Sequence, residues 1–305
     1  MRPEVPATFA LGGIFVLSIM AGMLVSELYG PEYQAFGPDT GNAGNALEYV
    51  ALILAFTFGI LMAVKYVGRK AVKYLFLGIT GFTVYFVLVP IVLLAGSELL
   101  ALAVSLGAAI AFTAMLYIYP EWWVIDSSGI LMAIGLTAIL GISFGPLPAL
   151  LLLAVLAVYD AIAVYQTKHM IELADTVVSE NLPIMFVIPK KAGYSFLKKE
   201  KGLKQQIQEG GERDALFMGL GDVIIPGALV VSAYHFGSRA TDFYGVTGNV
   251  AVAIITLVGG LIGFYFLMRA VLKGNPQAGL PLLNGGTVAA YLIASFVVWG
   301  NIYLG

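Results

Sequence analysis

The chain has 305 residues, of which 60% are hydrophobic and 11% are charged, whereas a soluble globular protein is about 45–50% apolar and about 25% charged. The net charge of −2 argues against a nucleic-acid surface, because phosphate binding needs a concentrated excess of Lys and Arg. The sequence contains no cysteine, which excludes disulfides, thiolate metal sites and a cysteine nucleophile.

Long apolar runs follow one another along the chain. A membrane-spanning helix needs about 20 predominantly apolar residues to cross roughly 30 Å of hydrocarbon. The uncharged stretch 127–159 is too long for one span, and Gly145 and Pro146 divide it into two helices. The prediction is an all-α integral membrane protein, a nine-transmembrane-helix bundle whose spans are residues 9–25, 49–67, 75–95, 99–117, 124–144, 147–167, 215–236, 246–268 and 280–303.

The basic residues predict the orientation of these spans, because Lys and Arg accumulate on cytoplasmic loops. With nine alternating spans, all of the 16 Lys and Arg residues except Arg239 fall on one side of the membrane. The amino terminus is therefore predicted to lie inside and the carboxyl terminus outside. We expect a multi-pass protein of the cell membrane.

The spans divide the chain into three parts. We expect residues 1–169 to form a bundle of six helices, residues 170–214 a cytoplasmic loop, and residues 215–305 the last three helices. Within the loop, residues 182–189 form a short apolar run bounded by prolines, which predicts a strand or an interfacial segment. In the eighth span, Gly259 and Gly263 form a GxxxG pair, which predicts close packing against another helix.

Two acidic residues lie well inside predicted spans, where a carboxylate is costly and therefore a functional candidate. Asp160 precedes Lys168 by eight residues, and Asp222 follows Asp214 by eight. At about 1.5 Å per residue, both acids lie roughly 12 Å from the cytoplasmic helix ends. Because helices joined by one loop are commonly neighbours, we expect the two side chains to face each other.

Two close carboxylates do not both ionise easily, so the pair shares one proton. The ionised member can remove a proton from water while the protonated member donates to a scissile carbonyl oxygen. This is aspartic-protease chemistry, and it needs no metal or cofactor. Next to Asp222, two glycines allow close approach of a substrate backbone, and Pro226 leaves one helical hydrogen bond unmade.

Three short motifs resemble the presenilin and signal peptide peptidase family of intramembrane aspartyl proteases, and the resemblance covers nearly the whole chain. The motifs are Tyr159-Asp160 in the sixth span, Gly219-Leu220-Gly221-Asp222 in the seventh, and Pro281-Leu282-Leu283 at the start of the ninth. The third motif departs from the family's Pro-Ala-Leu, because Leu282 stands where the family has alanine. The chain looks like an archaeal presenilin homologue.

The resemblance implies an aspartic endopeptidase that cleaves transmembrane segments of single-span proteins with outside amino termini. It implies that Asp160 and Asp222 are catalytic and that seven further residues bind substrate or shape the site: Tyr159, Gly219, Leu220, Gly221, Pro281, Leu282 and Leu283. The expected partners are transmembrane substrates and membrane lipid, with no nucleic acid; a homo-oligomer and partner subunits are both left open.

Other interpretations of the two acids remain open at this point. They suit a proton- or cation-coupled transporter or channel, or a scaffold that binds helices without cutting them. A third acid, Asp126, lies three residues from Trp123 and is interpreted as an interfacial carboxylate. A zinc intramembrane protease lacks its His-Glu-x-x-His ligands here. The 182–189 run and the segment before Asp222 are also candidates to pair with an unwound substrate as an added strand.

Overall fold

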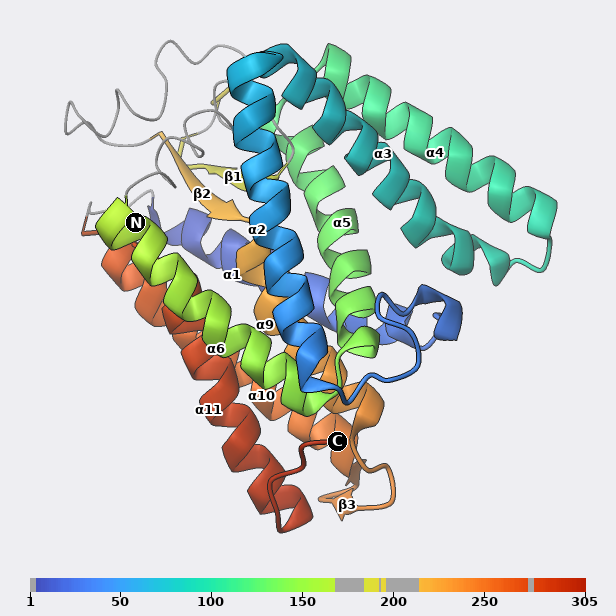
Figure 1. Cartoon of the computed structure of the whole chain (residues 1–305), viewed down its shortest axis with the longest axis vertical. Helices are drawn as coiled ribbons and strands as arrows, with labels where there is room; N and C mark the ends of the chain where they lie inside the picture. The colour runs from blue at the N-terminus through green and yellow to red at the C-terminus, as the bar shows by residue number, and fades with distance from the viewer. Residues whose placement is uncertain (1–3, 168–183, 192, 196–213, 274–276) are drawn as a thin grey trace. The chain divides into compact units, whose positions relative to one another are not determined.

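The structure is a computed structural model that describes residues 4–167, 184–191, 193–195, 214–273 and 277–305 (Figure 1). Within these residues, eight helices are long and apolar enough to cross a membrane, and α9 is a shorter apolar helix. The helices are α1 (Glu4–Ser26), α2 (Ala43–Tyr66), α3 (Arg69–Leu93), α4 (Glu98–Ile118), α5 (Trp122–Ser143), α6 (Pro146–Ile162), α9 (Gly221–Phe236), α10 (Gly248–Val271) and α11 (Leu280–Trp299). The predicted membrane-helical fold is therefore confirmed.

The seventh predicted span, residues 215–236, is wrong in its first part. The segment Ala215–Gly219 is strand β2, and it pairs antiparallel with β1 (Met185–Pro189). Hydropathy alone does not distinguish a buried strand from a helix, and Gly219 and Gly221, where β2 ends and α9 begins, weaken a helix at this point. The strand predicted within 182–189 is confirmed for the part from residue 185 onward, while residues 182 and 183 lie outside the described residues.

A glycine followed by a proline sets the boundary between α5 and α6. Pro146 begins α6 directly after Gly145, so the predicted break in the long apolar stretch is confirmed. The helix continues beyond Ile162 into a π-helical turn, Ala163–Thr167. A small hairpin, β3 (Asp242–Phe243) and β4 (Val246–Thr247), precedes α10.

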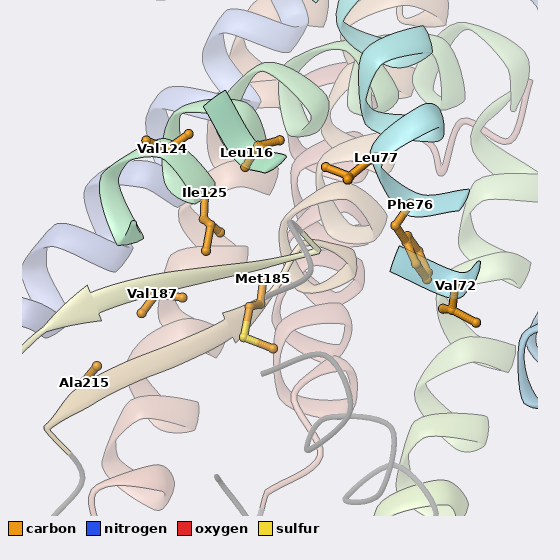
Figure 2. Packing of buried hydrophobic residues seen from close by; sticks show 9 residues of the cluster. All are labelled: Val72, Phe76, Leu77, Leu116, Val124, Ile125, Met185, Val187 and Ala215. Atoms are coloured by element: carbon orange, nitrogen blue, oxygen red, sulfur yellow. The ribbon is translucent and has the colours of Figure 1, made fainter. Parts of the chain in front are cut away.

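The chain divides into two compact units, of which the first comprises Met1–Ile14, Ala55–Met132 and Lys168–Leu220. It contains α3, α4, the β1–β2 hairpin, and parts of α1, α2 and α5. Both faces of the hairpin are largely buried, which explains why its strands are almost continuously apolar. Figure 2 shows the apolar core in which the hairpin packs against α3, α4 and α5, and its buried residues are Val72, Phe76, Leu77, Leu116, Val124, Ile125, Met185, Val187 and Ala215.

The second unit comprises Phe15–Leu54, Ala133–Thr167 and Gly221–Gly305. Within it, α11 packs against α6, α9 and α10, and α6 also packs against α9. In Figure 1, α11 (red) lies beside α6 (yellow-green). Both predicted catalytic acids and the Pro281 segment belong to this unit.

Close packing of α10 on α11 depends on small residues, as the GxxxG pair predicts. A side-chain Cβ added at Gly259 would overlap the Gly286 carbonyl oxygen, and one added at Gly263 would overlap the Leu282 carbonyl oxygen. The two backbones therefore approach closely only because these positions carry no side chain. This contact fixes the beginning of α11 against α10.

Candidate active site

Asp160 lies in the last turn of α6 and is 5% exposed. Its Oδ2 accepts a 3.0 Å hydrogen bond from the main-chain N–H of Leu280, the first residue of α11. The N–H of Gly279 provides a second backbone hydrogen bond to the same carboxylate. The beginning of α11 thus holds the Asp160 side chain through its backbone.

Asp222 is the second residue of α9 and is partly buried. Its position near a helix start differs from the sequence prediction, which placed it eight residues inside a span. The carboxyl group lies against Gly279, because a Cβ built on that glycine would stand 2.8 Å from Asp222 Oδ1. Pro226 lies one turn further along α9 and has no N–H to donate to the Asp222 carbonyl.

The two acids therefore meet at one backbone segment, Gly279–Leu280. Asp160 is hydrogen-bonded to the amides of this segment, and Asp222 lies against the α-carbon side of Gly279. With standard bond lengths for the atoms that join these contacts, Asp160 Oδ2 and Asp222 Oδ1 lie within roughly 10 Å of each other. Both carboxyl groups and the segment belong to the second unit.

The Pro281-Leu282-Leu283 motif directly follows this segment. Pro281 occupies the first turn of α11, where its missing N–H costs no helical hydrogen bond. The Leu282 side chain is 37% exposed, so the departure from alanine adds bulk on an open side of the helix, whereas Leu283 is fully buried. The motif places the helix start, and the main-chain groups just before it reach the acids.

The other predicted site residues lie at different levels of burial. Tyr159 is partly buried. Gly219 and Gly221 are exposed and flank the buried Leu220. Gly219 and Leu220 belong to the first unit, and Gly221 begins the second.

Sequence reasoning missed four residues that support the acids. Besides Gly279 and Leu280, these are Tyr165, whose hydroxyl bonds to the Gln277 side chain at 3.1 Å, and Asn284, whose Nδ2 donates to the Leu153 carbonyl at 2.9 Å. Asn284 could have been singled out from the sequence, because a polar side chain is costly in an apolar span. The backbone donors could not, because every residue except proline has an N–H.

The interpretation of Asp126 as an interfacial carboxylate in contact with headgroups or water is wrong about this contact. The residue is 5% exposed, and its Oδ1 accepts a hydrogen bond from the Val187 N–H. Proximity to Trp123 in the sequence suggested the interface, but the β1–β2 hairpin covers this face of α5 in the first unit.

Comparison with known proteins shows the family of the chain. The sequence model of the family described as signal-peptide peptidase, presenilin aspartyl protease matches residues 12–300. Two solved structures of a presenilin family intramembrane aspartate protease are similar to the chain. The structure in space group C222 has a TM-score of 0.65 and 30% identity, and covers 95% of this chain and 97% of that chain.

The structure in space group P2 has a TM-score of 0.64 and 33% identity, and covers 93% of this chain and 97% of that chain. No curated protein matches the sequence. The family match spans nearly all of the chain, and the similar structures extend over both compact units. The chain belongs to the signal-peptide peptidase and presenilin family and is an intramembrane aspartyl protease.

Proposed function

We propose that Asp160 and Asp222 are the catalytic pair of this protease. The observation that supports this assignment is their common contact with Gly279: Leu280 and Gly279 donate to Asp160, and the Asp222 carboxyl lies against the Gly279 α-carbon. A glycine at this position lets the buried Asp160 and the partly buried Asp222 contact one backbone segment, where a side chain would overlap the Asp222 carboxyl.

In the proposed reaction, the two carboxyl groups share one proton. The ionised carboxylate takes a proton from water as the water oxygen attacks the scissile carbonyl carbon, and the protonated carboxyl donates its proton to the carbonyl oxygen. The tetrahedral intermediate then collapses as the leaving amine nitrogen receives a proton. One peptide bond and one water are consumed, and a new carboxyl terminus and a new amino terminus are formed.

The proposed substrates are transmembrane segments of single-span proteins with outside amino termini. Apolar spans around the acids favour an apolar substrate, and the basic loop predicted to lie inside orients it. We assign site-shaping or substrate-binding roles to the residues that flank the acids: Tyr159, Gly219, Leu220, Gly221, Pro281, Leu282 and Leu283. Membrane lipid surrounds the spans.

A substrate must be unwound before it is cut, because a helical peptide bond is sterically shielded. We propose that the unwound segment adds as a strand to β2, whose last residue, Gly219, precedes Asp222 by three positions in the chain. The two strands predicted to bind substrate pair with each other, so only an outer edge of the hairpin is available. Strand addition would then fix the register of the scissile bond.

Reconstituted protein with a synthetic single-span substrate tests the catalytic pair. Asp160→Asn and Asp222→Asn each remove one carboxyl group at nearly constant size, and each is expected to lower the rate at least about 100-fold. Asp242→Asn, at an exposed acid of β3, is the matched control and should cleave normally. Cleavage retained in either site variant, measured by mass spectrometry of the products, would reject the pair.

A further inference from the structure

Asp126 is a buried acid that the proposed chemistry does not use. Its Oδ1 accepts a 2.7 Å hydrogen bond from the Val187 N–H on β1, and both residues lie in the first unit. Its Oδ2 has no hydrogen-bond partner among the residues that the structure describes. Burying a carboxyl group costs free energy, so we expect a buried acid that bonds to β1 to have a role in holding that strand.

The hydrogen-bond pattern of the hairpin determines which edge each strand residue faces. The Leu220 N–H donates to the Ile184 carbonyl, and in an antiparallel pair this bonded arrangement recurs at every second position. Val187 and the other odd-numbered residues of β1 therefore point their N–H and C=O groups away from β2. The Asp126 carboxylate meets Val187 on that outer edge.

The outer edge of β1 is closed to a further strand. Its central N–H, on Val187, is already bonded to Asp126, and the last odd-numbered residue, Pro189, has no N–H. An added strand on this edge would have to displace the hydrogen bond from Val187 to Asp126 and would find no donor at the proline.

The outer edge of β2 is different. By the same alternation, Phe217 points its N–H and C=O groups outward, as do the first and last residues of the strand. Within the described ranges, the sheet has only the two strands β1 and β2, so no other strand occupies this edge. An unpaired edge is a ready template for an extended peptide.

Packing on α5 reinforces the bond from Asp126. Gly129, nearly one turn further along the helix, makes room for the hairpin, because a Cβ there would stand 3.0 Å from the Phe186 ring and 3.3 Å from Leu220. In Figure 2, Ile125 of the same helix lies beside β1, near Val187. The face of α5 that carries Asp126 and Gly129 therefore contacts both β1 and Leu220, the residue that follows β2.

We propose that Asp126 is a positioning residue that closes the outer edge of β1 and holds the hairpin, so that an extended substrate segment adds only to β2. This role rests on the proposed addition of substrate to the hairpin. The consequence is specificity of register: an extended segment pairs in one register with a hairpin that is held at Val187, and β2 ends three residues before Asp222 in the chain.

Amide hydrogen exchange in the wild-type protein tests the arrangement without any mutation. The Val187 amide should be protected with and without a hydroxyl-bearing transition-state peptide, whereas the Phe217 amide should gain protection, by at least about tenfold, only when the peptide is bound. A Phe217 amide that never gains protection would reject substrate addition to β2. A Val187 amide that exchanges freely, or gains protection with the peptide, would reject the role of Asp126.

Two substitutions then separate positioning from folding. Asp126→Asn keeps an acceptor oxygen and should retain the wild-type cleavage position, whereas Asp126→Leu removes it and should broaden the cleavage positions and lower the main product about tenfold or more. Ser127→Ala changes a neighbouring hydroxyl that bonds to the Trp123 carbonyl of its own helix and is the control.

If Asp126→Leu does not fold, the exchange experiment and Asp126→Asn decide the question. Wild-type cleavage positions in a folded Asp126→Leu protein would overturn the proposal, as would broadened positions in a folded Asp126→Asn protein. Neither result would affect the catalytic pair, which the aspartate-to-asparagine variants of Asp160 and Asp222 test independently.

Discussion

Gly279 lies directly against Asp222: a Cβ built on this glycine stands 2.8 Å from the carboxyl Oδ1 and 3.0 Å from Cγ. Real Cβ atoms do not approach other heavy atoms this closely. Gly279 is also buried and bonded through its N–H to Asp160. A side chain at this position would therefore displace one acid or break the backbone hydrogen bond to the other.

Gly279→Ala is expected to lower cleavage by at least about tenfold, since small displacements of catalytic groups cost up to about 100-fold in rate. Gly285→Ala, in the second turn of α11, has no atom within 4 Å of the added Cβ and is the matched control. Rates with a reconstituted substrate, at equal amounts of folded protein, provide the comparison. Equal rates for the two variants would show that Gly279 does not position the acids.

The sequence predicts those parts of the fold that depend on hydrophobicity. Long apolar runs must be helical in a membrane, because no water is present to satisfy the backbone, and the break at Gly145 and Pro146 follows from the same reasoning. The β1–β2 hairpin was harder to predict in full. In a run such as 215–219 the apolar pattern suits a helix or a strand, and only pairing with residues about 30 positions away decides between them.

The sequence predicts the part of the candidate site that consists of side chains, but it does not predict the part that consists of backbone groups. Asp160 and Asp222 are conspicuous, because acids are rare in apolar spans. The N–H groups of Gly279 and Leu280 have no signature in the sequence, since almost every residue has one. Asp126 was misinterpreted because its partner, the Val187 amide, is also a backbone group.

Asn284→Leu should separate activity from stability. Asn284 is 1% exposed and joins α11 to the Leu153 carbonyl of α6, one turn from Leu280. Its Oδ1 has no partner among the described residues, so an apolar side chain of similar size should change the free energy of unfolding by less than about 1 kcal/mol. Cleavage should nevertheless fall roughly three- to tenfold, because α11 is no longer tied to α6 beside the acid.

Thr287→Val is the control for this variant, since its hydroxyl bonds to the Leu283 carbonyl of its own helix. Melting temperature and cleavage rate should be measured on the same preparations. A loss of rate that merely follows a loss of stability, or equal rates for the two variants, would contradict a tethering role for Asn284.

Gly263→Ala should destabilise the packing of α10 on α11. The added Cβ would overlap the Leu282 carbonyl oxygen and stand 3.0 Å from the Leu283 α-carbon. Overpacking of this kind costs about 1–3 kcal/mol, and it should also lower cleavage, because these residues follow the segment that contacts the acids. Gly107→Ala, at an exposed position of α4 with open space around it, should instead leave stability unchanged or raise it by up to about 1 kcal/mol. Thermal unfolding in one detergent measures both, and equal melting temperatures would contradict the close contact.

We predict that ionisation of the Tyr194 hydroxyl lowers the free energy of unfolding of the first unit at alkaline pH. Burial raises the pKa of the Tyr194 hydroxyl to about 12, and the nearby charges of Asp214 and Glu121 contribute in the same direction. In the unfolded chain this hydroxyl ionises near pH 10, so the unfolded state releases its proton first. The stabilising contribution is therefore complete below pH 10 and is lost as the pH rises towards 12.

Tyr194→Phe removes the titrating hydroxyl and keeps the ring. Its stability should fall less steeply than that of the wild type between pH 10 and pH 12, and the two curves should run parallel below pH 9. Tyr244→Phe, at a tyrosine that is 93% exposed, should follow the wild-type curve and is the control. Urea unfolding at each pH measures the difference, and curves that remain parallel up to pH 12 would show that the Tyr194 hydroxyl ionises equally in the folded and unfolded states.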